Sequence, residues 1–243
     1  MDKVPFDFKK NMPRTWQTYP NGLFLRHSIE VEIRQHLSDC EGKRLVAVGP
    51  LAHELNMSHC KVEQRIRLDW QEEAFTDLVS EPDALAIDAD TIDVMVVPML
   101  LNYTDEHHQV LREIQRVLVA GGKLCIIAFN PWSLWGMRTT TGKWSNNTFW
   151  KARQHFGYRI QDWLELLQFD VYSRTTVGPF LPWKTASTFM PQWMSSWSQS
   201  GHRFGAVQIL FAEKKVIPMT LIRERWKNFA VTGTPEMNLR EKL

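Results

Sequence analysis

The chain is short of cysteine, of long apolar runs and of net charge, and each shortage excludes a class of protein. Its three cysteines are isolated in the sequence, so they cannot supply the framework of a disulfide-stabilised secreted domain. No stretch approaches the roughly 18 uncharged apolar residues of a membrane-spanning helix. The opening MDKVPFDFKK has no apolar signal core. We therefore expect a cytoplasmic protein with free thiols and no membrane span.

The formal charge of +2 over 243 residues identifies no partner, and neither do the eight histidines. None of the histidines pairs with a cysteine at zinc-ligand spacing, so we expect no metal site. The last segment, Glu213–Leu243, carries seven Lys or Arg against four Asp or Glu. We interpret it as a solvated basic tail, with contact to nucleic acid or anionic lipid as the alternative. The sequence gives no clear signal for a nucleic-acid partner and none for an oligomeric state.

Apolar residues are plentiful, and they recur in short segments with the periods of strands and helices. The predicted strands span residues 44–48, 61–68, 92–97, 123–129, 169–176 and 206–214. The predicted helices span 22–37, a segment from Thr104 that Gly121-Gly122 ends, and 159–168. This alternation predicts a doubly wound α/β domain with seven strands, five of them parallel. We expect the last two predicted strands to pair antiparallel at one edge.

The predicted domain has additions at both ends and one insertion. We divide the chain into an N-terminal arm and helix (1–43), the α/β domain (44–214) with a tryptophan-rich insert (177–205), and the basic tail (215–243).

Four positions are candidates for a ligand site, because ligands of open α/β sheets bind beyond the carboxyl ends of the strands. The first is the turn Val48-Gly49-Pro50 in the stretch VAVGPLAHEL. Asp69 is the second: it lies 20 residues beyond Gly49, which is the spacing of an acid that binds ribose hydroxyls. The third is Glu81, which we place just before the region of the third strand and which could accept from an adenine amino group. The fourth is the turn Pro98-Met99 after the strand at 92–97.

The stretch EPDALAIDADTIDVMVVPMLLNYTDEHHQVLREIQRVLVAGGKLCIIAFNPWSLWG (81–136) resembles class I S-adenosylmethionine-dependent methyltransferases of the type 11 group. Val110 through Ile126 match that group's pattern hLREIxRVLxpGGxLxI closely, and FNPWSLWG is similar to a bacterial, largely uncharacterised branch of it. The resemblance implies a Rossmann-like methyltransferase fold and S-adenosylmethionine as the cofactor. It also implies that Asp69 and Glu81 hold the cofactor's ribose and adenine.

The glycine turn departs from the family's first motif, acid-x-Gly-x-Gly-x-Gly. Ala47 replaces the acid that helps to hold the cofactor's ammonium group, and only Gly49 is retained. Leu51 and His53 stand at the second and third glycine positions, where glycine lets the backbone approach a ligand closely. We therefore predict that this chain binds the cofactor weakly for the family.

The sequence does not identify a catalytic base, although His155 and Tyr158 are candidates. Of the eleven tryptophans, eight lie between Trp132 and Trp197. Those just beyond the strand at 123–129 predict either a packed lid or an aromatic wall for an apolar or planar small molecule. Two functions remain open: a methyltransferase acting on an unknown substrate, and a non-catalytic module that binds a partner through its tryptophan-rich surface. A nicotinamide-dependent oxidoreductase is disfavoured, because the chain has no GxGxxG motif.

Overall fold

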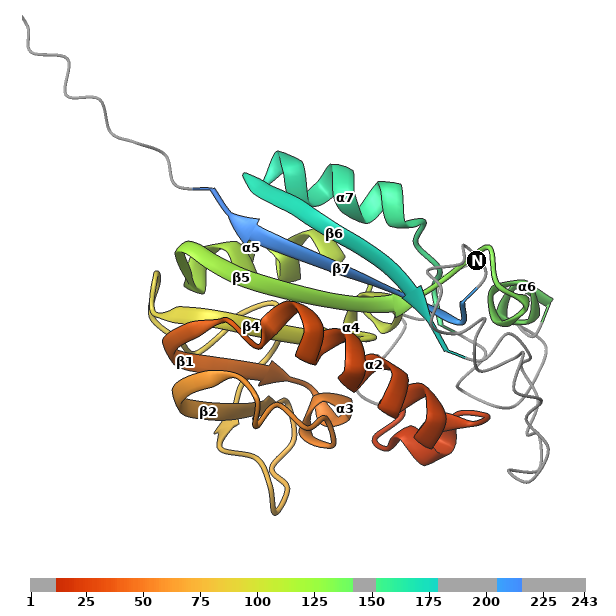
Figure 1. Ribbon diagram of the computed structural model, residues 1–243, viewed down its shortest axis with the longest axis horizontal. Helices are drawn as coiled ribbons and strands as arrows, with labels where there is room; N and C mark the ends of the chain where they lie inside the picture. The colour runs from red at the N-terminus through yellow and green to blue at the C-terminus, as the bar shows by residue number, and fades with distance from the viewer. Residues whose placement is uncertain (1–11, 142–151, 179–204, 216–243) are drawn as a thin grey trace, which may run out of the picture.

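The computed structural model describes residues 12–141, 152–178 and 205–215. Within these residues the chain forms a single seven-stranded sheet with helices on both faces (Figure 1). The strands are β1 (Glu41–Val48), β2 (Lys61–Asp69), β3 (Leu78–Val79), β4 (Ile92–Pro98), β5 (Leu118–Phe129), β6 (Phe169–Val177) and β7 (Val207–Lys214). The helices are η1 (Trp16–Thr18), α2 (Gly22–Leu37), α3 (Pro50–His53), α4 (Leu100–Tyr103), α5 (His107–Val117), α6 (Leu134–Thr141) and α7 (Gly157–Leu166). None of the described helices is long and apolar enough to cross a membrane.

The strand order is β3-β2-β1-β4-β5-β7-β6, and every pair from β3 to β5 is parallel. β7 pairs antiparallel with both β5 and β6. The predicted fold is thereby confirmed: five parallel strands, and an antiparallel pair at one edge. The tryptophan-rich insert at 177–205 and the basic tail lie largely outside the described residues, as do Trp144 and Trp150.

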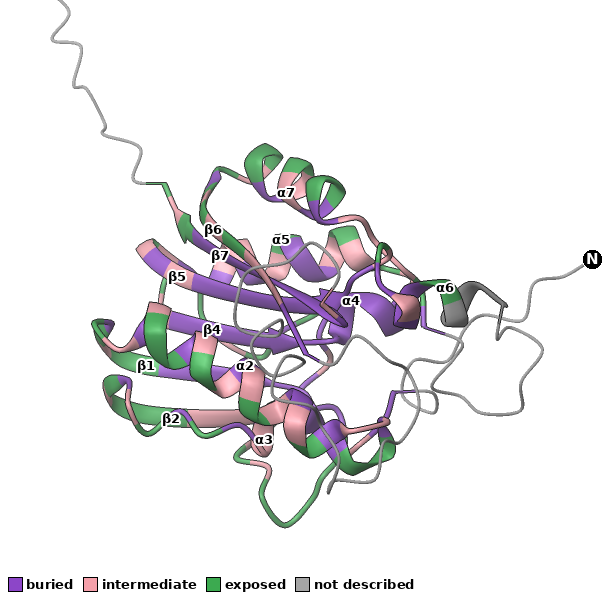
Figure 2. Ribbon diagram, turned by 45° about the vertical axis from the view of Figure 1, so that its right-hand side comes forward, coloured by how far each residue is buried: buried purple, intermediate pink, exposed green. Residues whose placement is uncertain are grey.

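The sheet's core is built from strands that are apolar on both faces. All of β5 from Leu124 to Phe129 is buried, as is β7 from Val207 to Ala212 (Figure 2). α2 packs on one face of the sheet, where the ring of His36 stacks on Phe211 of β7 with centroids 4.2 Å apart. α5 and α7 lie together on the other face (Figure 1), joined by the stacking of His107 on Trp163.

The prediction that Gly121-Gly122 caps a helix beginning at Thr104 is wrong. α5 begins at His107 and ends at Val117, and Leu118 already pairs with Ile92 as the first residue of β5. The two glycines lie inside β5, where the register with β4 shifts. Gly121 has φ +79°, and a Cβ on Gly122 would lie 2.9 Å from the Val119 carbonyl oxygen. The glycines therefore permit a bulge in a strand rather than the end of a helix.

Candidate functional site

The turn after β1 keeps one of the features of a cofactor loop. Gly49 has φ +87° and is the N-cap of α3, and Pro50 is the first residue of that four-residue helix. The Gly49 N–H donates to the Leu68 carbonyl of β2 at 2.7 Å, so the turn continues the parallel ladder beyond Val48. Leu51 is fully buried, which means that its side chain packs into the core. Burial also lowers the pKa of His53, although the nearby Asp69 carboxylate opposes the shift.

Asp69 is the last residue of β2, and its side chain has no exposed surface. One carboxylate oxygen accepts a hydrogen bond from Arg14 at 2.7 Å, and the other accepts from the backbone N–H of Gln71 at 3.3 Å. The Arg14 guanidinium also contacts Glu73 and donates to the Gln71 side chain. Asp69 therefore lies at the carboxyl end of β2, where the sequence predicts it, but an arginine is in contact with it.

Glu81 belongs to the same edge, although the sequence-based placement of it before the third strand is wrong. β3 is only two residues long and precedes Glu81, so the carboxylate follows the strand's carboxyl end. The Ser80 N–H donates to the Asp69 carbonyl at 2.9 Å, which places Glu81 next to the end of β2. Glu81 then forms an isolated antiparallel bridge with Ala84.

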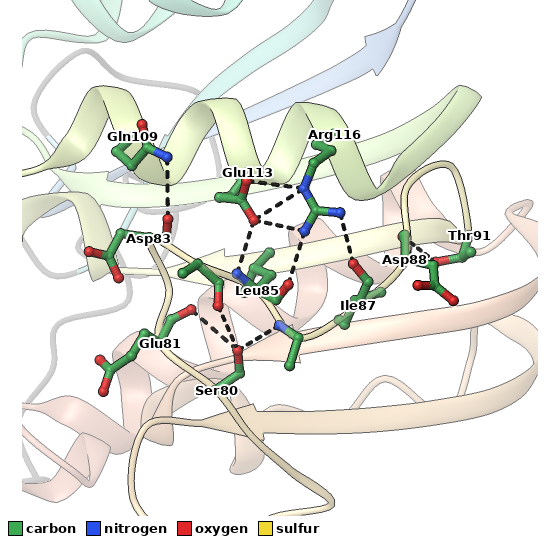
Figure 3. Close-up of polar contacts among 12 residues, drawn as sticks. Ser80, Glu81, Asp83, Leu85, Ile87, Asp88, Thr91, Gln109, Glu113 and Arg116 are labelled. Atoms are coloured by element: carbon green, nitrogen blue, oxygen red, sulfur yellow. Dashed lines mark hydrogen bonds and ion pairs between the residues drawn. The ribbon is translucent and has the colours of Figure 1, made fainter.

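Helix α5 holds the loop that carries Glu81. Arg116 donates to the carbonyls of Leu85 and Ile87, both at 2.9 Å, and is paired with Glu113 at 2.8 Å. Glu113 in turn accepts the Leu85 N–H at 3.0 Å. Figure 3 shows the two side chains pointing from the helix to the loop, with Glu81 directed away from it. The network thus fixes the backbone of Leu85 and Ile87, a few residues after Glu81, against α5.

The turn after β4 is strained in the way that functional turns often are. Met99 is fully buried and adopts φ +57°, a left-handed conformation that costs a non-glycine residue about 1–3 kcal/mol. Its N–H donates to the Ile127 carbonyl of β5 at 2.7 Å. Pro98 is the last residue of β4. The chain continues from β1 to β2 on one side of the sheet and from β4 to β5 on the other, so the strand order reverses between β1 and β4, next to Pro98 and Met99. That boundary is the usual ligand position of an open α/β sheet.

The aromatic residues after β5 divide into buried and exposed groups. Trp135 is fully buried, whereas Trp132 is 64% exposed and contacts Phe156 at 5.7 Å between ring centroids. Phe156 stacks in turn on Tyr158, which is also exposed. Asn130 is structural: its side chain donates to the Gly205 carbonyl and accepts the Trp132 N–H. Exposed Trp132, half-buried Phe156 and exposed Tyr158 together form a short aromatic strip beyond β5.

The ring of His155 lies between α4, α5 and α7. Its Nε2 is 3.1 Å from the Leu101 carbonyl oxygen, and its ring packs on His107 and Trp163. Burial lowers the pKa of His155 to about 4, with the neighbouring His107 as the next cause. The side chain is therefore a neutral part of the packing between α5 and α7.

Sequence reasoning missed the groups that cover the site. Trp70 and Met12 lie closest to the position that a Cβ on Gly49 would take, at 3.4 and 3.6 Å. Arg14, which neutralises Asp69, is 55 residues away from it in the chain. No local pattern marks these residues, because the segment from Met12 onward reads as irregular sequence between prolines. Only the adjacency of Trp70 to Asp69 offered a signal.

Residues 33–126 match the family described as "Methyltransferase domain", and the seven-stranded fold is shared with solved S-adenosylmethionine-dependent methyltransferases. The match and the shared fold support a methyltransferase domain over that part of the chain. Its sequence is 28% identical over 214 residues to the uncharacterised protein YafS of Escherichia coli (strain K12), covering 86% of this chain and 84% of that protein.

Two solved structures illustrate the shared fold. A methyltransferase from Thermotoga maritima, described as a possible histamine N-methyltransferase, superposes with a TM-score of 0.62 at 18% identity, covering 79% of this chain and 90% of that one. The [4+2]-cyclase SpnF superposes with a TM-score of 0.54 at 17% identity, covering 78% of this chain and 80% of that one. At these identities the likeness establishes the fold and not the reaction.

Proposed function

We propose that the protein is a methyltransferase that uses S-adenosylmethionine, with the adenosine half of the cofactor held at the ends of β1, β2 and β3. The observation that carries the proposal is the pair of carboxylates at this edge: Asp69 ends β2, and Glu81 follows β3 one residue beyond a backbone contact to Asp69. A carboxylate accepts two hydroxyl hydrogen bonds from a ribose, and a second can accept from the adenine amino group. Gly49 and the Pro98-Met99 turn would line the same ligand.

The reaction requires little of the protein beyond alignment of the acceptor atom with the methyl carbon of the cofactor. A nucleophilic atom of the acceptor attacks the methyl carbon, the carbon–sulfur bond breaks, and S-adenosylhomocysteine leaves with the bonding electron pair. A proton leaves the acceptor when it begins as a neutral O–H or N–H group. Because the sulfonium is already electrophilic, positioning supplies much of the rate, so an assigned base is not required for the proposal.

The methionine half of the cofactor has fewer partners than is usual for the family. Ala47 offers no carboxylate to the ammonium group, and it is buried inside β1. We therefore expect weak binding of S-adenosylmethionine relative to enzymes with the complete motif. The strip formed by exposed Trp132, half-buried Phe156 and exposed Tyr158 supports a planar or apolar small-molecule acceptor, since such ligands bind against aromatic side chains.

The alternative, a non-catalytic module of the same fold, has one observation in its favour. Asp69 is fully buried and paired with Arg14, while Trp70 and Met12 contact the Gly49 turn. A domain that had lost its cofactor would fill the site in this way. The two functions differ in whether the purified protein binds the cofactor at all.

Calorimetric titration with S-adenosylmethionine and S-adenosylhomocysteine tests the proposal directly. Both should bind, and S-inosylhomocysteine should bind about 10-fold more weakly, because hypoxanthine lacks the amino group that Glu81 would accept. Equal binding of the adenine and hypoxanthine compounds would remove Glu81 from the site. Absence of binding by all three compounds would leave the non-catalytic module as the better account.

A further inference from the structure

The segment ahead of α2 covers the carboxyl ends of β1 and β2. Trp16 anchors it: the indole is fully buried, and its Nε1 donates to the Leu51 carbonyl of α3 at 2.8 Å. In Figure 1 this segment, at the red end of the colour range, runs beside α3. The residues from Met12 to Arg14 lie on the other side of that anchor and reach toward β2. From here on, "the arm" means these three residues alone, a small part of the longer N-terminal arm that the sequence predicts.

All three guanidinium nitrogens of Arg14 contact residues at or just beyond the end of β2. One terminal nitrogen donates to Asp69, the other donates to the Gln71 side chain, and Nε pairs with Glu73. Asp69 also accepts the Gln71 N–H, so both of its oxygens are engaged. A ribose diol would need those oxygens as acceptors. Arg14 and the ribose would therefore compete for the same carboxylate.

The arm also covers the glycine turn. The Met12 methyl lies 3.6 Å from the position of a Cβ on Gly49, on the same side as the Trp70 ring. Met12 is almost fully buried, although it is the first residue of the described chain. Two of the groups that cover Gly49 and Asp69, Met12 and Arg14, are thus close together in one short segment, whereas the Trp70 ring beside Gly49 belongs to the residue that follows β2.

We propose that the arm is a latch on the cofactor site, and that Arg14 must leave Asp69 before S-adenosylmethionine or S-adenosylhomocysteine can bind. The inference rests on the proposed function. Thr15 is exposed and extended, so the chain can swing there while Trp16 stays in place. The Arg14 side chain is 28% exposed, and an ion pair partly open to water is weak enough to exchange for a ligand. The latch lowers apparent affinity, because only the open fraction of molecules binds.

The test is calorimetric titration of S-adenosylhomocysteine into the full chain and its variants. Arg14→Ala should bind about fivefold more tightly or better than the wild type, because the open state no longer has to be populated against the ion pair. Arg44→Ala is the matched control. Arg44 is exposed and lies in the first half of β1, away from the carboxyl end of that strand. Its replacement removes the same charge, so the affinity of this variant for S-adenosylhomocysteine should equal that of the wild type. Arg14→Gln serves in place of Arg14→Ala if the latter fails to fold.

A double variant shows whether the latch acts through Asp69. In the Asp69→Ala background, Arg14→Ala should give no gain in affinity, because the contact that it releases is already absent. Binding by the wild type with no gain, or with a loss, in Arg14→Ala overturns the latch and leaves the proposed function intact. A persisting gain in the Asp69→Ala background also overturns it. If no variant binds the ligand or is stabilised by it against heat, the proposed function and the latch both fail.

Discussion

Replacing Arg116 by methionine should release the loop that carries Glu81 from helix α5. Methionine keeps an apolar stem of similar length, so the change removes mainly polar contacts. Those contacts are hydrogen bonds to the carbonyls of Leu85 and Ile87, and the pairing with Glu113. A bond from a charged donor contributes about 1.5–3 kcal/mol when shielded from water. Because the Arg116 side chain is 37% exposed, we expect a total loss of about 2 kcal/mol.

The assay is equilibrium unfolding in urea, with Arg112→Met as the matched control. Arg112 lies about one turn earlier on α5 and is exposed, and it donates to the Gln109 side chain on the same helix. Its replacement should cost less than about 0.5 kcal/mol. The denaturation midpoint should fall for Arg116→Met with little change in slope, since the fold stays the same. Equal losses in the two variants would refute the assignment of Arg116 as the residue that holds the loop.

Three further predictions concern the site and its surroundings. Asp69→Ala should weaken S-adenosylhomocysteine binding at least ~10-fold, and unchanged calorimetric affinity would make the 20-residue spacing from Gly49 accidental. Gly49→Ala should cost about 1–2 kcal/mol of stability in urea because φ is +87°, and a cost near zero would show that the turn readily relaxes. Stability should fall as pH drops below the ordinary histidine pKa of 6.5 toward about 4, because His155 stays neutral in the fold while the unfolded chain takes up a proton. The contribution of His155 to the loss at pH 5 relative to pH 7 should be about 1–2 kcal/mol after allowance for solvent screening. His155→Gln should reduce the loss by that amount and leave the part that comes from His53, His59 and His107, whose pKa values burial also lowers. An equal loss in the wild type and in His155→Gln would contradict this assignment.

The sequence was sufficient for the sheet because its strands carry their own signal. The run IDVMVV in β4 is apolar on both faces, which is typical of a parallel strand covered by helices. The segments at 169–176 and 206–214 predicted the antiparallel edge because no helical pattern lies between them. Local rules failed where a distant strand decided the outcome. Gly121-Gly122 resembled a helix end, but Leu118 pairs with Ile92 and draws the chain into β5 before the glycines are reached.

The sequence predicts where Asp69 lies in the fold, but not what its carboxylate contacts. Spacing placed Asp69 at the end of β2, because a strand's length and the turn before it are local properties. The Arg14 contact joins residues 55 apart, and one of them lies in a segment without periodicity. Whether Asp69 faces a ligand or an arginine is therefore a property of the folded chain.

The position of β7 has a consequence for the order in which the protein can fold during synthesis. Of the described strands, β7 is the last to leave the ribosome, yet it lies between β5 and β6 in the finished sheet. Within the described residues, β6 pairs only with β7, so it has no neighbouring strand until Val207–Lys214 has been made. Until then the nascent chain exposes one edge of β5 and the apolar residues that β7 will cover, which is the kind of surface that recruits chaperones. Completion of the sheet is thus delayed until nearly the whole domain has been translated.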